Sequence, residues 1–184
     1  ETFGTSGPRI KVRFFAGYNF ENSNLNDQDL IQDAYSKNIP MGGDIIQEKG
    51  KNPRFLVWAI SDPLGAPLQR VQIIKGWLAD GEQREKVFDV ACSDGQSVNP
   101  LNHRCPDNGA KVNLDDCSIS REKGNAEIKT FWQDPEFSND QEAFYYARVL
   151  ENPTCRWSTW DAVRAEEKPR SDIPVTIQER AWSS

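Results

Sequence analysis

Four cysteines and one histidine carry the most reactive side-chain chemistry in this sequence. Cys92, Cys105 and Cys117 lie in residues 92–123, a stretch rich in Ser, Asp, Asn, Gly and Pro, and Cys155 follows later. An even set of cysteines in such a segment favours two disulfides and an oxidising compartment, periplasmic or extracellular. The connectivity stays open, because sequence alone does not choose among the pairings. We expect Cys155 to tie the end of a strand to the loop.

A zinc site and a nucleophilic triad are the alternative uses of these side chains. Zinc commonly takes closely spaced CxxC pairs, and this sequence has none, while His103 is its sole histidine. A triad needs a base, and His103, close to Cys105 in the loop, is expected to be a solvent-exposed loop residue. The zinc alternative stays open, but we expect no catalytic residue, no metal ligand and no cofactor in this chain.

Carboxylates near the cysteines are candidates for calcium binding or for acid/base chemistry, since hard cations need several oxygens close together. The segment 89–99 contains oxygen donors but lacks the alternate-position pattern of a calcium loop. We therefore expect solvated loop acids. The candidates are Asp89, Asp94, Asp115 and Asp116.

Tryptophans are numerous for this length, and most of them fall in the last third of the chain. An exposed indole such as Trp157, next to Arg156, could stack on a sugar ring while polar neighbours bind its hydroxyls. Burial in a sheet core is the commoner use of tryptophan, so both interpretations are kept. The late tryptophans are Trp132, Trp157, Trp160 and Trp182.

Cationic side chains alternate with apolar ones near the beginning of the chain. Arg9, Lys11 and Arg13 have Ile10 and Val12 between them, which predicts a strand with one buried face and one cationic face. Such a face could hold a phosphate or sulfate. A solvated sheet face is the simpler expectation.

The elements that must position these residues are mostly strands. Asp80-Gly81 between two of them predicts a hairpin, and Pro40 ends a helical pattern. The sequence therefore predicts a mainly β, antiparallel, sandwich-like domain with one or two short helices and a disulfide-stapled loop region. The expected strands are 9–15, 54–60, 68–77, 86–91, 127–132 and 143–150, the expected helix lies within Asn22 to Asn38 with Asn26 or Asp27 as cap, and 157–165 is expected to form one or two helical turns.

Length and charge limit the function classes. The 184 residues suit a single domain, 1–184, and the net charge of -6 is spread along the chain, so we expect no nucleic-acid partner. No apolar run approaches the ~18 residues of a membrane span, so none is predicted. Because Met41 is the only methionine, we expect the chain to be part of a larger protein.

Several phrases resemble the C-terminal part of a bacterial family of exported, uncharacterised proteins, which is similar to the PHP (polymerase and histidinol phosphatase) superfamily of metal-dependent phosphoesterases. They span the chain. The phrases are ETFGTSGPRI at 1–10, PMGGD at 40–44, VQIIKGW at 71–77, YYARVLENPTCRWSTWDA at 145–162 and TIQERAWSS at 176–184.

The resemblance implies that residues 1–10 are the junction with an upstream PHP-like domain, which would carry the divalent metal. No metal ligand of that superfamily maps onto this chain. We expect an accessory β-sandwich that packs on or caps that domain, with Arg9, Arg13, Arg156 and Trp157 facing it or its substrate. A glycan-binding module is the alternative, and a free-standing hydrolase would need a base that the sequence hardly offers.

Overall fold

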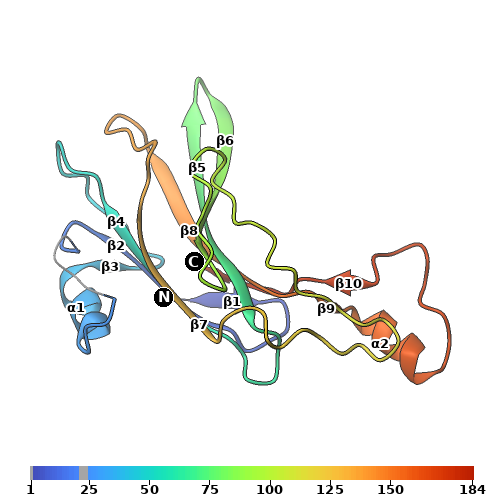
Figure 1. Cartoon of the computed structure of the whole chain (residues 1–184). Helices are drawn as coiled ribbons and strands as arrows, with labels where there is room; N and C mark the ends of the chain where they lie inside the picture. Colours follow the sequence, from blue (N-terminus) through green and yellow to red (C-terminus); the bar gives the residue numbers. More distant parts are fainter. Residues whose placement is uncertain (1, 21–24) are drawn as a thin grey trace.

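The computed structural model describes residues 2–20 and 25–184, which form a mainly β structure with two short helices (Figure 1). The helices are α1 (Leu30–Lys37) and α2 (Trp157–Arg164). The strands are β1 (Phe3–Thr5), β2 (Lys11–Gly17), β3 (Ile39–Pro40), β4 (Arg54–Ile60), β5 (Leu68–Ala79), β6 (Glu82–Cys92), β7 (Glu127–Gln133), β8 (Ala143–Glu151), β9 (Thr154–Cys155), β10 (Thr176–Ile177) and β11 (Arg180–Ser183).

Two antiparallel sheets carry the fold. One has the strand order β1-β11-β8-β5-β6 and the other the order β3-β2-β4-β7, while β9 and β10 form a separate two-stranded sheet. All the pairings between these strands are antiparallel. The mainly β, antiparallel fold class expected from the sequence is confirmed.

The core lies between the two larger sheets. Val12 and Phe14 of β2 contribute to it from one sheet, and Ile73 of β5 and Val149 of β8 from the other. Lys11 and Arg13, between the core residues of β2, are exposed. The alternation in the sequence therefore identified both the strand and its buried face.

Strand positions agree with the sequence better than strand ends do. β4 has the predicted bounds, but β6 begins at Glu82 instead of 86. Residues 82–85 are exposed and polar, so no alternation marks them as strand. The predicted hairpin turn is present: Asp80 and Gly81 both have positive φ and link the paired residues at the ends of β5 and β6, as a two-residue type I′ turn requires.

Helix α1 covers the outer face of the four-stranded sheet. Leu30 and Ala34 pack against Phe15, Phe20 and Leu56 in a second apolar cluster. The prediction began the helix too early, because the residues directly before Leu30, at 26–29, are all polar. Neither expected cap residue is the N-cap; Asp29 occupies that position, without a side-chain hydrogen bond to the helix. The expected positions 22–24, including Asn22, lie outside the described residues.

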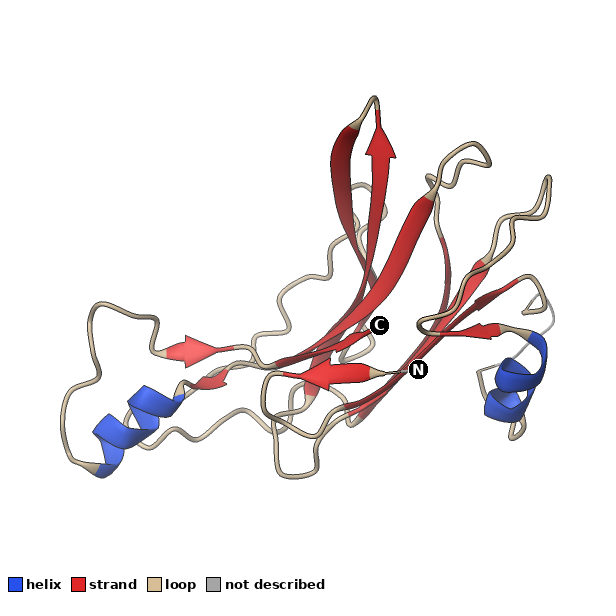
Figure 2. Cartoon of the chain, turned by 180° about the vertical axis from the view of Figure 1, so that it is seen from behind, coloured by secondary structure: helices blue, strands red, loops and turns tan. Residues whose placement is uncertain are grey.

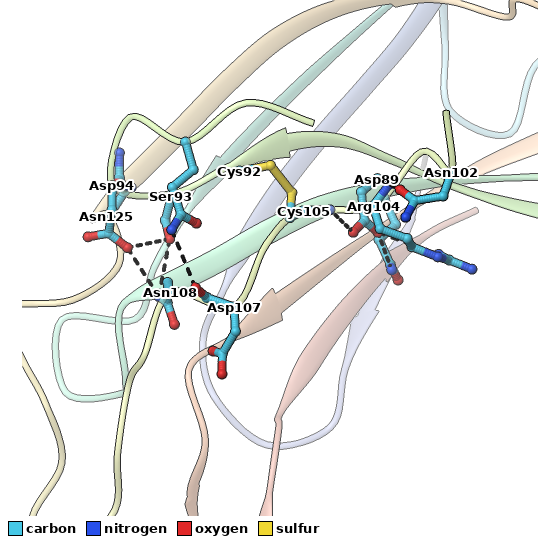
Figure 3. Close-up of a disulfide and its surroundings, with 12 residues drawn as sticks. Asp89, Cys92, Ser93, Asp94, Asn102, Arg104, Cys105, Asp107, Asn108 and Asn125 are labelled. Carbon is cyan, nitrogen blue, oxygen red and sulfur yellow. Dashed lines mark hydrogen bonds and ion pairs between the residues drawn. A yellow bond between two sulfur atoms is a disulfide. The ribbon is translucent and has the colours of Figure 1, made fainter. Parts of the chain in front are cut away.

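The loop region 92–123 is held by disulfides and polar side chains, as its composition predicts. The disulfides are Cys92–Cys105 and Cys117–Cys155. Figure 3 shows the polar surroundings of the first: the Asp89 carboxylate accepts the Cys105 N–H at 2.7 Å. These contacts replace the apolar core that the loop lacks.

A buried ion pair fixes one region of the sandwich. Lys75 of β5 donates to Asp134, just after β7, at 2.7 Å, and also to the carbonyl of Glu136 at 2.9 Å. The Tyr145 hydroxyl donates to the same Asp134 oxygen at 2.8 Å. Burial and the Asp134 charge raise the pKa of Tyr145 well above its ordinary value, so the hydroxyl keeps its proton.

The two ends of the described chain lie together, whereas the two helices lie far apart. β1 pairs with β11, and the Ser184 N–H donates to the Thr2 carbonyl at 2.9 Å. Figure 2 shows α2 projecting from one end of the molecule, beside β9 and β10, with α1 at the opposite end. No helix among the described residues is long and apolar enough to cross a membrane.

Candidate binding pocket

The first two expected interface residues begin the four-stranded sheet. Arg9 precedes β2, and its backbone N–H donates to Oδ2 of Asp62 at 2.7 Å, so β2 begins only at Lys11. Arg13 is exposed on β2 and pairs in register with Trp58 of β4. Both residues are exposed, Arg9 on the segment that leads from one sheet to the other and Arg13 on β2 itself.

The other two expected residues begin the projecting helix α2. Arg156 is the N-cap, in extended conformation, and its side chain donates to the Pro174 carbonyl at 3.1 Å. Trp157 is 74% exposed. The Thr159 hydroxyl anchors the first turn by donating to the Val175 carbonyl at 2.8 Å. The helix is thus tied to the residues directly before β10, while Trp157 faces solvent.

The structure does not bring the four residues into one site. Arg13 lies on β2 and the pair Arg156 and Trp157 on α2, well apart in both views (Figures 1 and 2). An open pocket of about 870 Å³ has lining residues near both regions. They include Pro8, directly before Arg9, and Trp160 of α2. We call it the acidic pocket. It is lined by Gly7, Pro8, Asp62, Leu64, Gly65, Ala66, Asp116, Cys117, Ser118, Ile119, Arg121, Glu151, Thr154, Trp160 and Glu179.

Glu151, the last residue of β8, is the buried carboxylate of the acidic pocket. Its side chain lines the pocket although the residue is only 1% exposed. The Ala66 N–H lies 3.4 Å from Oε2, a long contact, and Oε1 has no hydrogen-bond partner. A Cβ atom on Gly65 would lie 2.9 Å from Oε1. Gly65 therefore leaves the space in front of this oxygen that any other residue would fill.

The backbone around Glu151 explains why a carboxylate is held there. Its N–H donates to the Glu179 carbonyl at 3.0 Å, and its own carbonyl accepts from the Gln178 side chain at 3.0 Å. The end of β8 is thus fixed between Leu68 of β5, its partner in register, and the segment before β11. These backbone contacts place the Glu151 side chain at the pocket.

The electrostatic environment of Glu151 favours its protonated form. Burial is the main reason that its pKa rises from the ordinary 4.5 to about 7; the Ala66 N–H opposes the shift, and the charges of Asp62 and Glu179 add to it. The pKa of Asp62, in contrast, is lowered, because its carboxylate accepts hydrogen bonds from the N–H groups of Arg9 and Leu64. The pocket thus contains an ionised carboxylate near one that titrates around neutrality.

The rim adds two more acids and one cation. Asp116 is exposed, and the Ser118 N–H and hydroxyl hold its pKa below the ordinary value. Glu179 accepts a hydrogen bond from the Ser6 hydroxyl. Arg121 donates to the Gly65 carbonyl at 3.3 Å. Acidic groups therefore outnumber cationic groups among the residues that line the pocket.

The disulfide Cys117–Cys155 builds the wall between the loop and helix α2. Cys117 lines the pocket and has positive φ, and Cys155 lies in β9 directly before the helix N-cap. The expectation that Cys155 ties the end of a strand to the loop is confirmed. The bond holds Trp160 of α2 at the pocket, where its indole is 37% exposed.

Two expectations about the loop are wrong. His103 is not solvent-exposed: it is half-buried with positive φ, and its ring packs edge-on against Phe88 with 5.0 Å between centroids. Asp89 is not a solvated loop acid either, because it lies in β6, is buried, and accepts from the Gln72 side chain at 2.6 Å. Both residues serve the packing of the loop against the sheet, which local composition does not reveal.

The remaining loop acids, Asp94, Asp115 and Asp116, are exposed, as expected. Asp94 accepts hydrogen bonds from the Gly124 N–H at 2.9 Å and from the Asn108 side chain at 3.1 Å. Figure 3 places these groups beside the first disulfide. Across residues 2–20 and 25–184, no group of three His, Cys, Asp or Glu side chains is arranged to hold a metal ion.

A family model described as "Protein of unknown function (DUF3604)" matches residues 1–184, the whole chain. The chain belongs to this family. No curated protein and no solved structure matches it. The DUF3604 relationship therefore supports the family part of the resemblance seen in the sequence, and it assigns no reaction.

The tryptophans of this DUF3604 chain divide between the two interpretations. Trp132 packs against Phe55 and Phe88 in the core region, whereas Trp157 and Trp160 are exposed on α2. The sequence singled out Trp157 but missed Glu151. The signal that could have found it is the Tyr-Tyr-Ala-Arg-Val-Leu-Glu strand itself, which ends on an acid at a position where the alternation predicts a buried side chain.

Proposed function

We propose that this chain is the accessory β-sandwich of an exported protein whose upstream, PHP-like domain performs metal-dependent phosphoester hydrolysis. The observation that carries the proposal is the fixed path of the N-terminal segment. β1 pairs with β11 in one sheet, the Ser6 N–H donates to the Arg180 carbonyl at 3.0 Å, and the chain then enters β2 in the other sheet. In the proposed arrangement, the upstream domain would join the chain at this edge.

The surface near that segment supports a packing role. β1 is the outer strand of its sheet, and all three of its residues are exposed, including the apolar Phe3. An unpaired edge with an exposed aromatic side chain is usually covered in a native protein. Arg9 follows within a few residues and provides a cation for a neighbouring acidic or phosphorylated group.

The disulfides support export of the protein. Both pairs include cysteines of the loop region 92–123, which has few large apolar side chains, and disulfides of this kind persist in the periplasm or outside the cell. In the proposed arrangement the upstream domain supplies the metal and the chemistry, and this chain restricts or completes the entrance to that site.

Hydrolysis assays test the proposal directly. Chromogenic phosphomonoesters and phosphodiesters are offered, with zinc, manganese or magnesium, to this chain and to a protein that also contains the upstream segment. Turnover by the longer protein alone is expected. Turnover by the 184-residue chain would contradict the accessory role, and silence in both would contradict the assignment to phosphoester hydrolysis.

The docking residues are tested in the longer protein. Replacing Arg9 or Arg13 by alanine is expected to weaken substrate capture, while the matched exposed residue Lys111, distant in sequence from the junction, leaves turnover unchanged when replaced. If Arg156→Ala and Trp157→Ala leave both stability and turnover unchanged, α2 has no part in the interface.

A glycan-binding module is the second candidate, and the exposure of Trp157 favours it. Trp160 lies one helical turn further along α2 and is also exposed, so two indoles are presented by one short helix. Aromatic rings stack on sugar faces. The candidate requires saturable oligosaccharide binding with tryptophan quenching that is lost in Trp157→Ala; no binding across a broad glycan panel would refute it.

A further inference from the structure

The buried carboxylate of the acidic pocket has an oxygen without a hydrogen-bond partner. Glu151 is almost fully buried, its Oε1 has no partner, and its Oε2 has only the long contact to the Ala66 N–H. A buried ionisable group is normally paired, because leaving it unpaired costs free energy. Gly65 keeps side-chain atoms away from Oε1, and both Gly65 and Glu151 line the pocket. This carboxylate is therefore shaped to receive a donor from outside the chain.

The charge of the lining indicates the sign of that donor. Asp62, Asp116 and Glu179 line the same pocket as Glu151. The cation in the lining, Arg121, reaches the Gly65 carbonyl. A pocket with this excess of carboxylates attracts a cation and repels an anion.

The geometry favours an organic cation over a metal ion. A metal ion takes several carboxylate or imidazole ligands at close range, and the described part of the chain contains no group of three side chains that could hold one. A guanidinium instead can be held by one carboxylate together with an aromatic surface on which it stacks. Glu151 offers the first, and Trp160 in the pocket wall offers the second.

We propose that the acidic pocket binds a guanidinium group, with Glu151 as its anionic anchor and the Trp160 indole as its stacking wall. The Arg164 guanidinium, 5.4 Å from the centre of that ring, already occupies part of the indole surface, so the ligand meets the part that lines the pocket. Asp62 and Glu179 add long-range attraction without direct contact. The site is independent of the proposed accessory function, since it depends only on residues of this chain.

Proton linkage gives the site a recognisable pH dependence. The groups that face Glu151 are the carboxylates of Asp62 and Glu179 and the N–H of Ala66. Because its carboxyl has a pKa of about 7, Glu151 is largely neutral at pH 6 and ionised at pH 8. A guanidinium binds the ionised form, so its affinity rises by about 10-fold from pH 6 to pH 8. A neutral ligand that stacks on Trp160 would show no such rise.

The test is a titration of the chain with a blocked Gly-Arg-Gly peptide, with agmatine, and with the neutral isostere Gly-citrulline-Gly, followed by calorimetry and by the Trp160 indole signal in NMR. Saturable binding of the arginine peptide and no binding of the citrulline peptide are expected. Binding of the peptide but not of agmatine identifies an arginine side chain as the ligand, and equal binding of both identifies any free guanidinium compound.

Two variants locate the anchor. Glu151→Gln keeps the size of the side chain and is expected to weaken arginine binding by about 10-fold or more and to remove its pH dependence. Glu85→Gln, a matched exposed glutamate on β6, leaves both unchanged. If Glu151→Gln fails to fold, Trp160→Ala provides a second variant and is expected to weaken binding without removing the pH dependence. Equal binding of the citrulline peptide, preferential binding of calcium, or no binding of any probe would overturn the proposal.

Discussion

Replacing Glu151 by glutamine is expected to change how the stability of the fold depends on pH. The folded-state pKa of this carboxyl is about 7, against 4.5 in the ordinary state that represents the unfolded chain. Between these values the folded state binds the proton more tightly than the unfolded state, so the free energy of unfolding falls as the pH rises. The contribution of Glu151 is complete below pH 4.5 and is lost by the time the pH passes 7.

The size of this loss follows from the shift. A change from 4.5 to about 7 corresponds to ~3 kcal/mol at full strength. Because the carboxyl lines an open pocket, solvent screening reduces this to about 2 kcal/mol. Asp62 and Asp116 do not obscure it, since their lowered pKa values affect stability only as the pH falls through the folded values, below the ordinary 3.8.

Urea unfolding followed by tryptophan fluorescence at pH 5, 6, 7 and 8 measures the effect. Wild type is expected to lose about 2 kcal/mol relative to Glu151→Gln over this range. The control Glu85→Gln should run parallel to wild type, because Glu85 is exposed. A wild-type curve that stays parallel to Glu151→Gln at all four pH values would refute the buried, protonated state of Glu151.

Three further predictions concern the rest of the fold. Replacing both Cys117 and Cys155 by serine is expected to lower the unfolding free energy by about 4 kcal/mol, and replacing both Cys92 and Cys105 by ~3 kcal/mol. The first loss is larger because the sequence separations are 38 and 13 residues. Urea denaturation of each double variant shows which loss is larger. Asp134→Asn leaves the buried Lys75 ammonium without its counter-charge and is expected to cost roughly 3–5 kcal/mol, measured in the same way. Trp157→Ala should change stability by less than about 0.5 kcal/mol, because the indole is solvent-exposed; a larger loss in thermal unfolding would mean that α2 packs on the domain.

Period-two alternation explains why the strands were predictable from the sequence. β2 reads as alternating cationic and apolar residues, and its apolar face is the one buried between the sheets. The beginning of β6 was not predictable, since residues 82–85 form an exposed ribbon beyond the core and carry no apolar pattern. Helix α1 was predicted too long for a related reason: residues 26–29 are polar, and the buried residues of the helix begin at Leu30.

The acidic pocket was not predictable, because its parts are distant in the sequence. Glu151 ends β8, Gly65 lies in the turn after β4, Cys117 lies in the loop and Trp160 on α2. No local pattern relates these positions to one another. We expected Cys155 to tie a strand end to the loop, but its partner cysteine depends on how the loop crosses the sheet.

The disulfide Cys117–Cys155 links the two surfaces for which we propose functions. One of its residues lines the acidic pocket, and the other directly precedes the helix that presents Trp157 to solvent. The short sheet of β9 and β10 and the Thr159 hydroxyl hold the same helix from the other side. No residue of α2 belongs to either core cluster, so these local ties are what fixes its position. A change that releases them would therefore alter the pocket wall at Trp160 and the exposed tryptophan together, while the sandwich core stays intact.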